Sequence, residues 1–255
     1  MARSGVTISA SADLYDALAP IYDEWQGSAG MTPFAMVTEA KLAPRLERLA
    51  RGGALSFLDL GCGTGTLLCG LRATHPRWRL AGVDGSAAML ANAARKPEAR
   101  TIAWARAPLE GPLPIAARFD AAGAFYDALN HLPDGEALGR AFGAAAHALR
   151  SGGWMSFDVT NQLGFDRWWR GTRTFTAARW RIVIDAHIEA RGGRAIVTVE
   201  REHDLRRFEL RERVFEPAEI EARLVAAGFQ VEAREPWSPF DLDVPGKTWW
   251  TAIRR

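Results

Sequence analysis

The chain has 255 residues, a formal net charge of +2 and 48% hydrophobic residues, which fits one α/β domain with an insertion and gives no bias toward nucleic acid. Its two cysteines, Cys62 and Cys69, indicate neither a disulfide framework nor a zinc site. Because no apolar segment suits a signal peptide or a membrane span, we predict a single cytoplasmic domain over residues 1–255 that binds no metal, membrane or nucleic acid.

Two helices are expected before the first strand. Apolar residues recur at helical spacing from Ala12 to Trp25, with an interruption at Pro20. A second helix is predicted from Pro33 to Leu49, closed by the glycines at 52–53. These helices form a predicted N-terminal preface over residues 10–50.

The next part of the chain alternates between strand-like and helix-like segments. Short apolar runs predict strands at 54–60, 78–83, 101–105, 119–125 and 153–158, and helices are expected at 66–74, 86–95 and 135–149. Such alternation is typical of a Rossmann-like parallel sheet with helices on both faces. A last helix at 216–228 and two strands at 229–236 and 247–254 complete the predicted domain.

The pattern changes after Asn161. Residues 172–214 form long strand-like runs, joined by a predicted tight hairpin at 191–194. We therefore expect an antiparallel β insertion over residues 165–215. It is interpreted as a lid over the site or as an interface, which leaves monomer and homodimer both open.

A glycine-rich turn is the most distinctive feature of the sequence. The run FLDLGCGTGTL at 57–67 begins as a buried strand and then places glycines at alternate positions, where the backbone can bend tightly and approach a ligand. Asp84 ends the next apolar segment, where a carboxylate would meet ribose hydroxyls. Thr66 stands where a dinucleotide fingerprint has its third glycine, so the spacing disfavours NAD.

The string DLGCGTG resembles motif I of the class I S-adenosylmethionine-dependent methyltransferases, and Asp84 in GVDGSAAML resembles their ribose-binding acid. The resemblance extends over nearly all of residues 10–255. It implies a seven-stranded sheet that ends in an antiparallel hairpin, with S-adenosylmethionine as cofactor and S-adenosylhomocysteine as product. The cofactor-binding residues that it implies are Tyr22, Asp59, Gly61, Cys62, Gly63, Thr64, Gly65, Asp84, Gly85, Ser86, Met89, Leu109 and Phe125.

The family's usual acid after the third strand, which holds the adenine amino group, has no obvious equivalent in WARAPLEGPLP. Leu109 is expected to pack on the adenine ring or to offer its backbone N–H. Glu110 is a candidate substitute for the missing acid.

Polar residues follow the fourth strand in FDAAGAFYDALNHLPD, at the sheet edge where ligands bind in open α/β sheets. The loop resembles those of small-molecule N-methyltransferases such as the sugar N,N-dimethyltransferases. The catalytic candidates are Tyr126, Asp127 and His131, and Asn130 is a substrate-binding candidate. His131 suits a general base near neutral pH or a loop hydrogen bond. Asp127 suits orientation of His131, neutralisation of a cationic acceptor, or capping of a helix that begins near Leu129.

Aromatic residues supply the other substrate-binding candidates. Tyr15 and Tyr22 lie in DLYDALAPIYDEW, which resembles a string that closes over the cofactor in similar enzymes. Trp168 and Trp169 follow the fifth strand and are expected at the mouth of the acceptor pocket, with core packing as the alternative.

These observations predict transfer of a methyl group by in-line displacement to nitrogen or oxygen of a small-molecule acceptor, in secondary metabolism. The alternatives are an NAD-dependent oxidoreductase, a non-catalytic binding protein and a macromolecular methyltransferase. No Tyr-x-x-x-Lys pair supports the first, and no N-P-P-Y-type motif supports RNA or protein as the acceptor.

Overall fold

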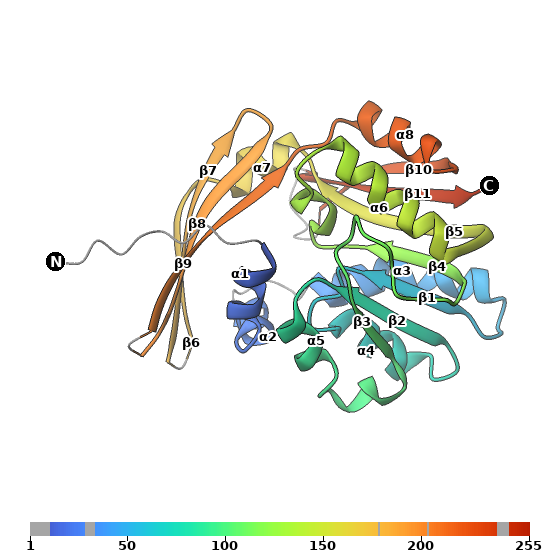
Figure 1. Ribbon diagram of the computed structural model, residues 1–255, viewed down its shortest axis with the longest axis horizontal. Helices are drawn as coiled ribbons and strands as arrows, with labels where there is room; N and C mark the ends of the chain where they lie inside the picture. Colours follow the sequence, from blue (N-terminus) through green and yellow to red (C-terminus); the bar gives the residue numbers. More distant parts are fainter. Residues whose placement is uncertain (1–10, 29–33, 178, 203, 239–244) are drawn as a thin grey trace.

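The computed structural model describes residues 11–28, 34–177, 179–202, 204–238 and 245–255. The larger of the two sheets has seven strands in the order β10-β11-β5-β4-β1-β2-β3 (Figure 1). The strands are β1 (Ser56–Leu60), β2 (Arg79–Asp84), β3 (Ala103–Arg106), β4 (Phe119–Ala124), β5 (Leu149–Thr160), β10 (Phe229–Trp237) and β11 (Lys247–Arg254). The first five pair in parallel, whereas β11 runs antiparallel to both β5 and β10. This arrangement confirms the predicted Rossmann-like sheet with a terminal hairpin.

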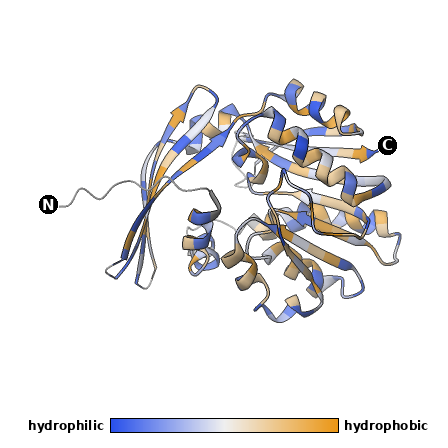
Figure 2. Ribbon diagram, viewed as in Figure 1, coloured by the Kyte–Doolittle hydropathy of each residue, from blue (hydrophilic) through white to orange (hydrophobic). Residues whose placement is uncertain are grey.

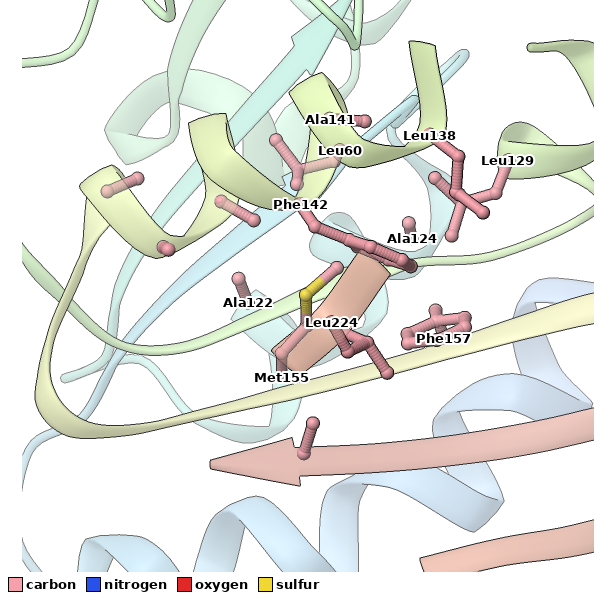
Figure 3. Close-up of a cluster of buried hydrophobic side chains, with 14 of the residues drawn as sticks. Leu60, Ala122, Ala124, Leu129, Leu138, Ala141, Phe142, Met155, Phe157 and Leu224 are labelled. Atoms are coloured by element: carbon pink, nitrogen blue, oxygen red, sulfur yellow. The ribbon is translucent and has the colours of Figure 1, made fainter. Parts of the chain in front are cut away.

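Helices cover both faces of this sheet because successive strand residues point in opposite directions. One face packs on α6 (Gly135–Ala148) and α8 (Pro217–Ala226), and Figure 3 shows Phe142 of α6 close to Met155 and Phe157 of β5. The other face packs on α3 (Phe34–Ala50) and α4 (Thr66–Thr74). A short helix, α5 (Ala87–Ala93), follows β2, and 3-10 helices occupy η1 (Pro97–Thr101) and η2 (Ala128–His131).

Within the predicted N-terminal preface, α1 (Ser11–Leu18) and α2 (Tyr22–Ser28), which we call the preface helices, are separated by a break at Pro20, where the sequence predicted one. Pro33, the expected first residue of the next helix, lies outside the described residues. Among the helices that the structure describes, none is long and apolar enough to cross a membrane.

The insertion forms a separate antiparallel sheet in the order β6-β7-β8-β9. Its strands are β6 (Gly171–Ala177), β7 (Trp180–Glu189), β8 (Gly192–Arg201) and β9 (Asp204–Arg213), preceded by a helix, α7 (Gln162–Trp168), that the sequence did not predict. The predicted hairpin is shifted, because Glu189 pairs with Gly192 and the turn is therefore at 190–191. A Cβ atom on Gly192 would lie 2.1 Å from the carbonyl oxygen of Glu212, so this close strand pairing requires glycine there.

This second sheet, which we call the lid sheet, has two unlike faces. Its inward face buries Ile182, Val197 and Phe208 in a cluster with Leu14 and Leu18 of α1. Figure 1 shows α1 beside the lid sheet. Its outward face carries cross-strand ion pairs such as Arg181–Glu200, and Figure 2 shows hydrophilic and hydrophobic residues interspersed along the strands. The preface helices thus lie between the lid sheet and the rest of the domain.

Candidate active site

A cavity of about 560 Å³ lies at the carboxyl ends of β1, β2 and β4, within the range of about 300–1,000 Å³ that small-molecule sites occupy. Its lining contains most of the predicted site residues: Tyr15, Tyr22, Gly61, Cys62, Gly63, Thr64, Asp84, Gly85, Ser86, Met89, Leu109, Phe125, Tyr126 and His131. Pro108 and Glu110 line it as well. The cofactor and acceptor candidates therefore share one cavity, while Asp59, Gly65, Asp127, Asn130, Trp168 and Trp169 are not part of the lining.

The glycine turn after β1 takes the conformation that its sequence predicts. Gly61, Gly63 and Gly65 have φ values of 75°, 53° and 70°, which L side chains rarely adopt. The backbone N–H groups of Gly61 and Cys62 both donate to the carbonyl oxygen of Val83, at 2.7 and 3.0 Å. A Cβ atom on Gly65 would lie 2.4 Å from the Trp104 ring. Gly65 therefore serves the packing beneath the turn rather than the cavity wall.

Asp84 fixes the turn from the neighbouring strand. Its carboxylate accepts hydrogen bonds from the backbone N–H groups of Gly63 and Ser86, each at 2.8 Å. Burial raises the pKa of Asp84, and these two bonds oppose that rise. The carboxylate at the end of β2 is thus held in one orientation at the cavity wall.

Asp59 stands behind the turn at 4% exposure. Burial, followed by repulsion from Asp84, raises its pKa to about 8. A raised pKa in the folded state means that Asp59 favours folding below its unfolded pKa, and that this contribution is lost as pH rises toward 8.

Replacing Asp59 by asparagine is therefore expected to flatten this pH dependence. Relative to Asp59→Asn, the free energy of unfolding of the parent should fall by about 1.4 kcal/mol per pH unit between about pH 5 and pH 7. Urea unfolding of both proteins across that range measures the difference. Parallel stability curves would contradict the buried, protonated state of Asp59.

Two carboxylates that the sequence analysis did not single out hold the preface helices over the cavity. Asp16 of α1 accepts hydrogen bonds from the Ser86 hydroxyl and from the backbone N–H of Ala88, the latter at 3.1 Å. Asp23 of α2 accepts from the Thr64 hydroxyl and pairs with Lys96 at 2.9 Å. The helices are thus tied to the glycine turn and to the segment after β2, and Tyr15 and Tyr22 are carried into the cavity wall.

Tyr15 and His131 meet on the acceptor side of the cavity. The Tyr15 hydroxyl lies 2.9 Å from His131 Nε2, and the two rings pack edge to face with centroids 5.5 Å apart. Burial lowers the pKa of His131 to about 4, so the imidazole is neutral near physiological pH. Glu212 of β9 approaches the same nitrogen, with Oε1 at 3.7 Å from Nε2. The sequence predicted the first two residues and missed the third.

The backbone of the acceptor loop is held in an unusual conformation. Tyr126 and Asp127 have φ values of 61° and 62°, a left-handed region that non-glycine residues seldom occupy. Asp127 accepts hydrogen bonds from Lys247 Nζ and from the Thr160 hydroxyl, both at 2.5 Å. Lys247 is 1% exposed and also lies 3.5 Å from Asp158. Of the roles left open for Asp127, capping of the following helix is ruled out, because its side chain makes no capping bond to η2 and instead accepts from Lys247 and Thr160.

Asn130 does not face the cavity. It is fully buried and its amide donates to the carbonyl oxygens of Thr160 and Arg213 at 3.0 and 2.7 Å, while its oxygen accepts from the Thr160 N–H at 2.9 Å. The side chain therefore joins the acceptor loop to β5 and to the end of the lid sheet. This bonding replaces the substrate contact that the sequence suggested.

The two adjacent tryptophans also serve packing. Trp168 lies against Gly164 and Gly246, where a Cβ atom on either glycine would come within 2.9 Å of its ring. Trp169 packs on Phe165, with ring centroids 5.2 Å apart. We expected this pair at the mouth of the acceptor pocket, but neither tryptophan lines the cavity.

Comparison with known proteins agrees with this geometry. Residues 57–153 match the methyltransferase domain family. The sugar N-methyltransferase KedS8 from Streptoalloteichus sp. is 26% identical and superimposes over 100% of this chain and 99% of its own, with a TM-score of 0.71. Residues 57–153 thus carry a methyltransferase domain, and the chain shares the fold of S-adenosylmethionine-dependent methyltransferases over nearly its whole length.

Other methyltransferases share the fold or part of the sequence. A Clostridium acetobutylicum S-adenosylmethionine-dependent methyltransferase superimposes over 94% of this chain and 99% of its own, with a TM-score of 0.74 at 19% identity. CalS10, an amino pentose methyltransferase from Micromonospora echinaspora, does so over 92% and 97%, with a TM-score of 0.68 at 22% identity. A Geobacillus sp. protein named as a methyltransferase is 31% identical over 157 residues, and the match spans 60% of each chain.

Proposed function

We propose that this methyltransferase binds S-adenosylmethionine in the cavity and transfers its methyl group to the nitrogen of a small-molecule amine. The proposal depends on one observation: the residues proposed to bind the cofactor and those proposed to bind the acceptor line the same cavity. Asp84 and the glycine turn form the cofactor half, and the Tyr15–His131 pair forms the acceptor half. The names of KedS8 and CalS10, a sugar N-methyltransferase and an amino pentose methyltransferase, support an amine on a sugar as the acceptor.

The residues present fit the cofactor. The Asp84 carboxylate suits the ribose hydroxyls, and Gly61 and Gly63 leave the cavity wall without side chains beside it. Leu109 and Met89 offer apolar surface for the adenine ring, and Glu110, the candidate substitute for the family's usual acid, lines the same cavity. When bound, S-adenosylmethionine supplies an electrophilic methyl group on a sulfonium.

The protein contributes alignment, exclusion of water and a proton acceptor. In-line displacement gains most from a fixed approach in a dry cavity, which the tethered helices α1 and α2 provide. The neutral imidazole of His131 can take a proton from an ammonium acceptor, and the Tyr15 hydroxyl holds the ring in place. The oligomeric state, monomer or homodimer, and the cytoplasmic location stay predictions from the sequence.

Methyl transfer to a matched panel of acceptors tests the proposal. The panel contains amino sugars, free and as nucleotide conjugates, their hydroxyl analogues, and simple phenols, and release of S-adenosylhomocysteine is measured. Turnover of amines above their hydroxyl analogues is expected. Turnover confined to hydroxyl acceptors would contradict nitrogen as the target, and binding of S-adenosylmethionine without any turnover would favour the non-catalytic alternative.

His131→Ala is expected to lower turnover by about 100-fold or more, as loss of general acid–base catalysis usually does, while affinity for S-adenosylmethionine stays within about twofold. His147→Ala, on the last turn of α6, is the matched control. Steady-state kinetics and calorimetric titration measure the two quantities. Full activity in His131→Ala would show that His131 only forms a hydrogen bond within the loop and takes no part in catalysis.

A further inference from the structure

Acidic groups outnumber basic ones in the buried cluster behind His131. Lys247 Nζ lies 2.5 Å from Asp127 and 3.5 Å from Asp158, so these two carboxyl groups share one ammonium group. Glu212 is a third buried carboxyl group, with its side chain 8% exposed. Its Oε2 atom is buried and has no hydrogen-bond partner among the described residues. The cluster therefore holds one carboxyl group that no resident cation within the described chain neutralises at close range.

Glu212 reaches this cluster from the lid sheet. Its neighbours along β9 alternate, so Phe208 and Leu210 face inward with it, whereas Glu209 and Arg211 pair with each other on the outward face. Across the sheet it pairs with Gly193, which presents no side chain. The lid sheet thus delivers one carboxyl group to the inward face that also carries Phe208 and Leu210.

The surroundings of Glu212 favour its protonated form over its ionised form. The ionisable groups near it are Tyr15 on α1, Tyr22 on α2, His131 on η2, Asp127 after β4, Asp158 on β5 and Lys247 on β11. Burial raises the pKa of Glu212 well above its usual range, and repulsion from Asp127 adds to this rise. Such a group ionises readily only when another cation arrives beside it.

We propose that Glu212 selects a cationic amine acceptor over a neutral hydroxyl acceptor, because its carboxylate balances the ammonium group that enters beside His131 and then the imidazolium that His131 becomes. This inference rests on the proposed function and adds a positioning residue to it. Glu212 acts through His131, from which it is 3.7 Å away.

The proton and electron balance of the reaction defines this role. As the ammonium group enters, Glu212 releases its proton to solvent. The acceptor then passes one N–H proton to the His131 imidazole and becomes a neutral amine. Its lone pair forms the N–C bond to the methyl carbon as the C–S bond breaks, with the bonding electrons going to sulfur. The products are a methylated ammonium and S-adenosylhomocysteine, and the imidazolium returns its proton to solvent.

Sinefungin is a suitable probe because it carries an amine at the carbon that replaces the sulfonium and its methyl group. S-adenosylhomocysteine shares the rest of the molecule and has no such group. Calorimetric titration of both compounds, in two buffers that differ in ionisation enthalpy, gives the affinities and the protons released. The proteins compared are the parent, Glu212→Gln, and Glu209→Gln as the control from the outward face of the same strand.

The parent is expected to release close to one proton on binding sinefungin, and Glu212→Gln to release none. Loss of the carboxylate that balances the bound ammonium group should weaken sinefungin binding by about tenfold in Glu212→Gln, with S-adenosylhomocysteine affinity unchanged. Glu209→Gln should behave as the parent. Glu212→Asp, which keeps the charge on a shorter side chain, should recover part of the proton release.

The outcomes separate the two proposals. If the parent does not bind S-adenosylhomocysteine, the proposed function fails. If all the proteins bind S-adenosylhomocysteine, but Glu212→Gln matches the parent in sinefungin affinity and proton release, the role of Glu212 is overturned and the proposed function stands.

Discussion

Replacing Lys247 by methionine is expected to lower the free energy of unfolding by about 3–5 kcal/mol, as removal of one partner from a buried ion pair usually does. Lys247 is 1% exposed and is bonded to Asp127 at 2.5 Å. Methionine fills a similar volume, so the main loss is charge. Asp158, which is 0% exposed, would remain buried without its cation, and the half-buried Asp127 would lose the partner that anchors the strained turn at 126–127.

Chemical unfolding in urea measures this effect, with Lys41→Met as the matched control. Lys41 pairs with Glu235 at 2.9 Å but is 25% exposed, so its loss should cost no more than about 1 kcal/mol. Adding Asp127→Asn to Lys247→Met should restore part of the lost stability by removing the uncompensated charge. Equal decreases in the free energy of unfolding of the two lysine variants would show that the buried position of Lys247 does not make its ion pair more important for stability.

Asp84→Ala is expected to weaken S-adenosylmethionine binding by about 100-fold, which corresponds to about 2.7 kcal/mol. Two effects act together. The variant removes the charged acceptor proposed for the ribose hydroxyls, and it frees the Gly63 and Ser86 N–H groups that the carboxylate holds at 2.8 Å. The β2–β1 pairing beneath the turn is unaffected, so the fold should persist.

Calorimetric titration with S-adenosylmethionine checks this prediction, and circular dichroism checks the fold. Asp185→Ala, on the solvent side of the lid sheet, is the control and should bind as the parent does. Asp84→Asn separates the two effects, since it keeps the side-chain shape but loses the charge. Unchanged affinity of Asp84→Ala for S-adenosylmethionine would contradict the proposal that Asp84 binds the ribose hydroxyls.

Local sequence carried enough information to predict the geometry of the glycine turn and the place of Asp84, which form the proposed cofactor half of the site. The glycines at 61, 63 and 65 follow a buried strand directly, and their positive φ values are a property of the turn itself. Asp84 could be placed because parallel strands bring their carboxyl ends to the same edge of the sheet. The alternation of strands and helices likewise depends on short-range patterns, and it gave the sheet correctly.

The acceptor half depends on contacts that join distant parts of the chain. The three roles considered for Asp127 all came from its local surroundings in the loop, but its partner Lys247 lies 120 residues away. Asn130 was judged by its place in a polar loop, and its bonds run to Thr160 and Arg213. One signal was available, because Lys247 is one of three lysines in the chain and stands at the head of an apolar strand, KTWWTAI. A charge in such a position indicates a buried partner.

Parallel titration of the protein with S-adenosylmethionine, S-adenosylhomocysteine and NAD tests the central claim most directly. The geometry of the glycine turn and Asp84 predicts that both sulfur nucleosides bind with dissociation constants of about 1–100 μM and that NAD does not bind. Binding of NAD alone would contradict the cofactor assignment, and the proposed amine methylation would fall with it.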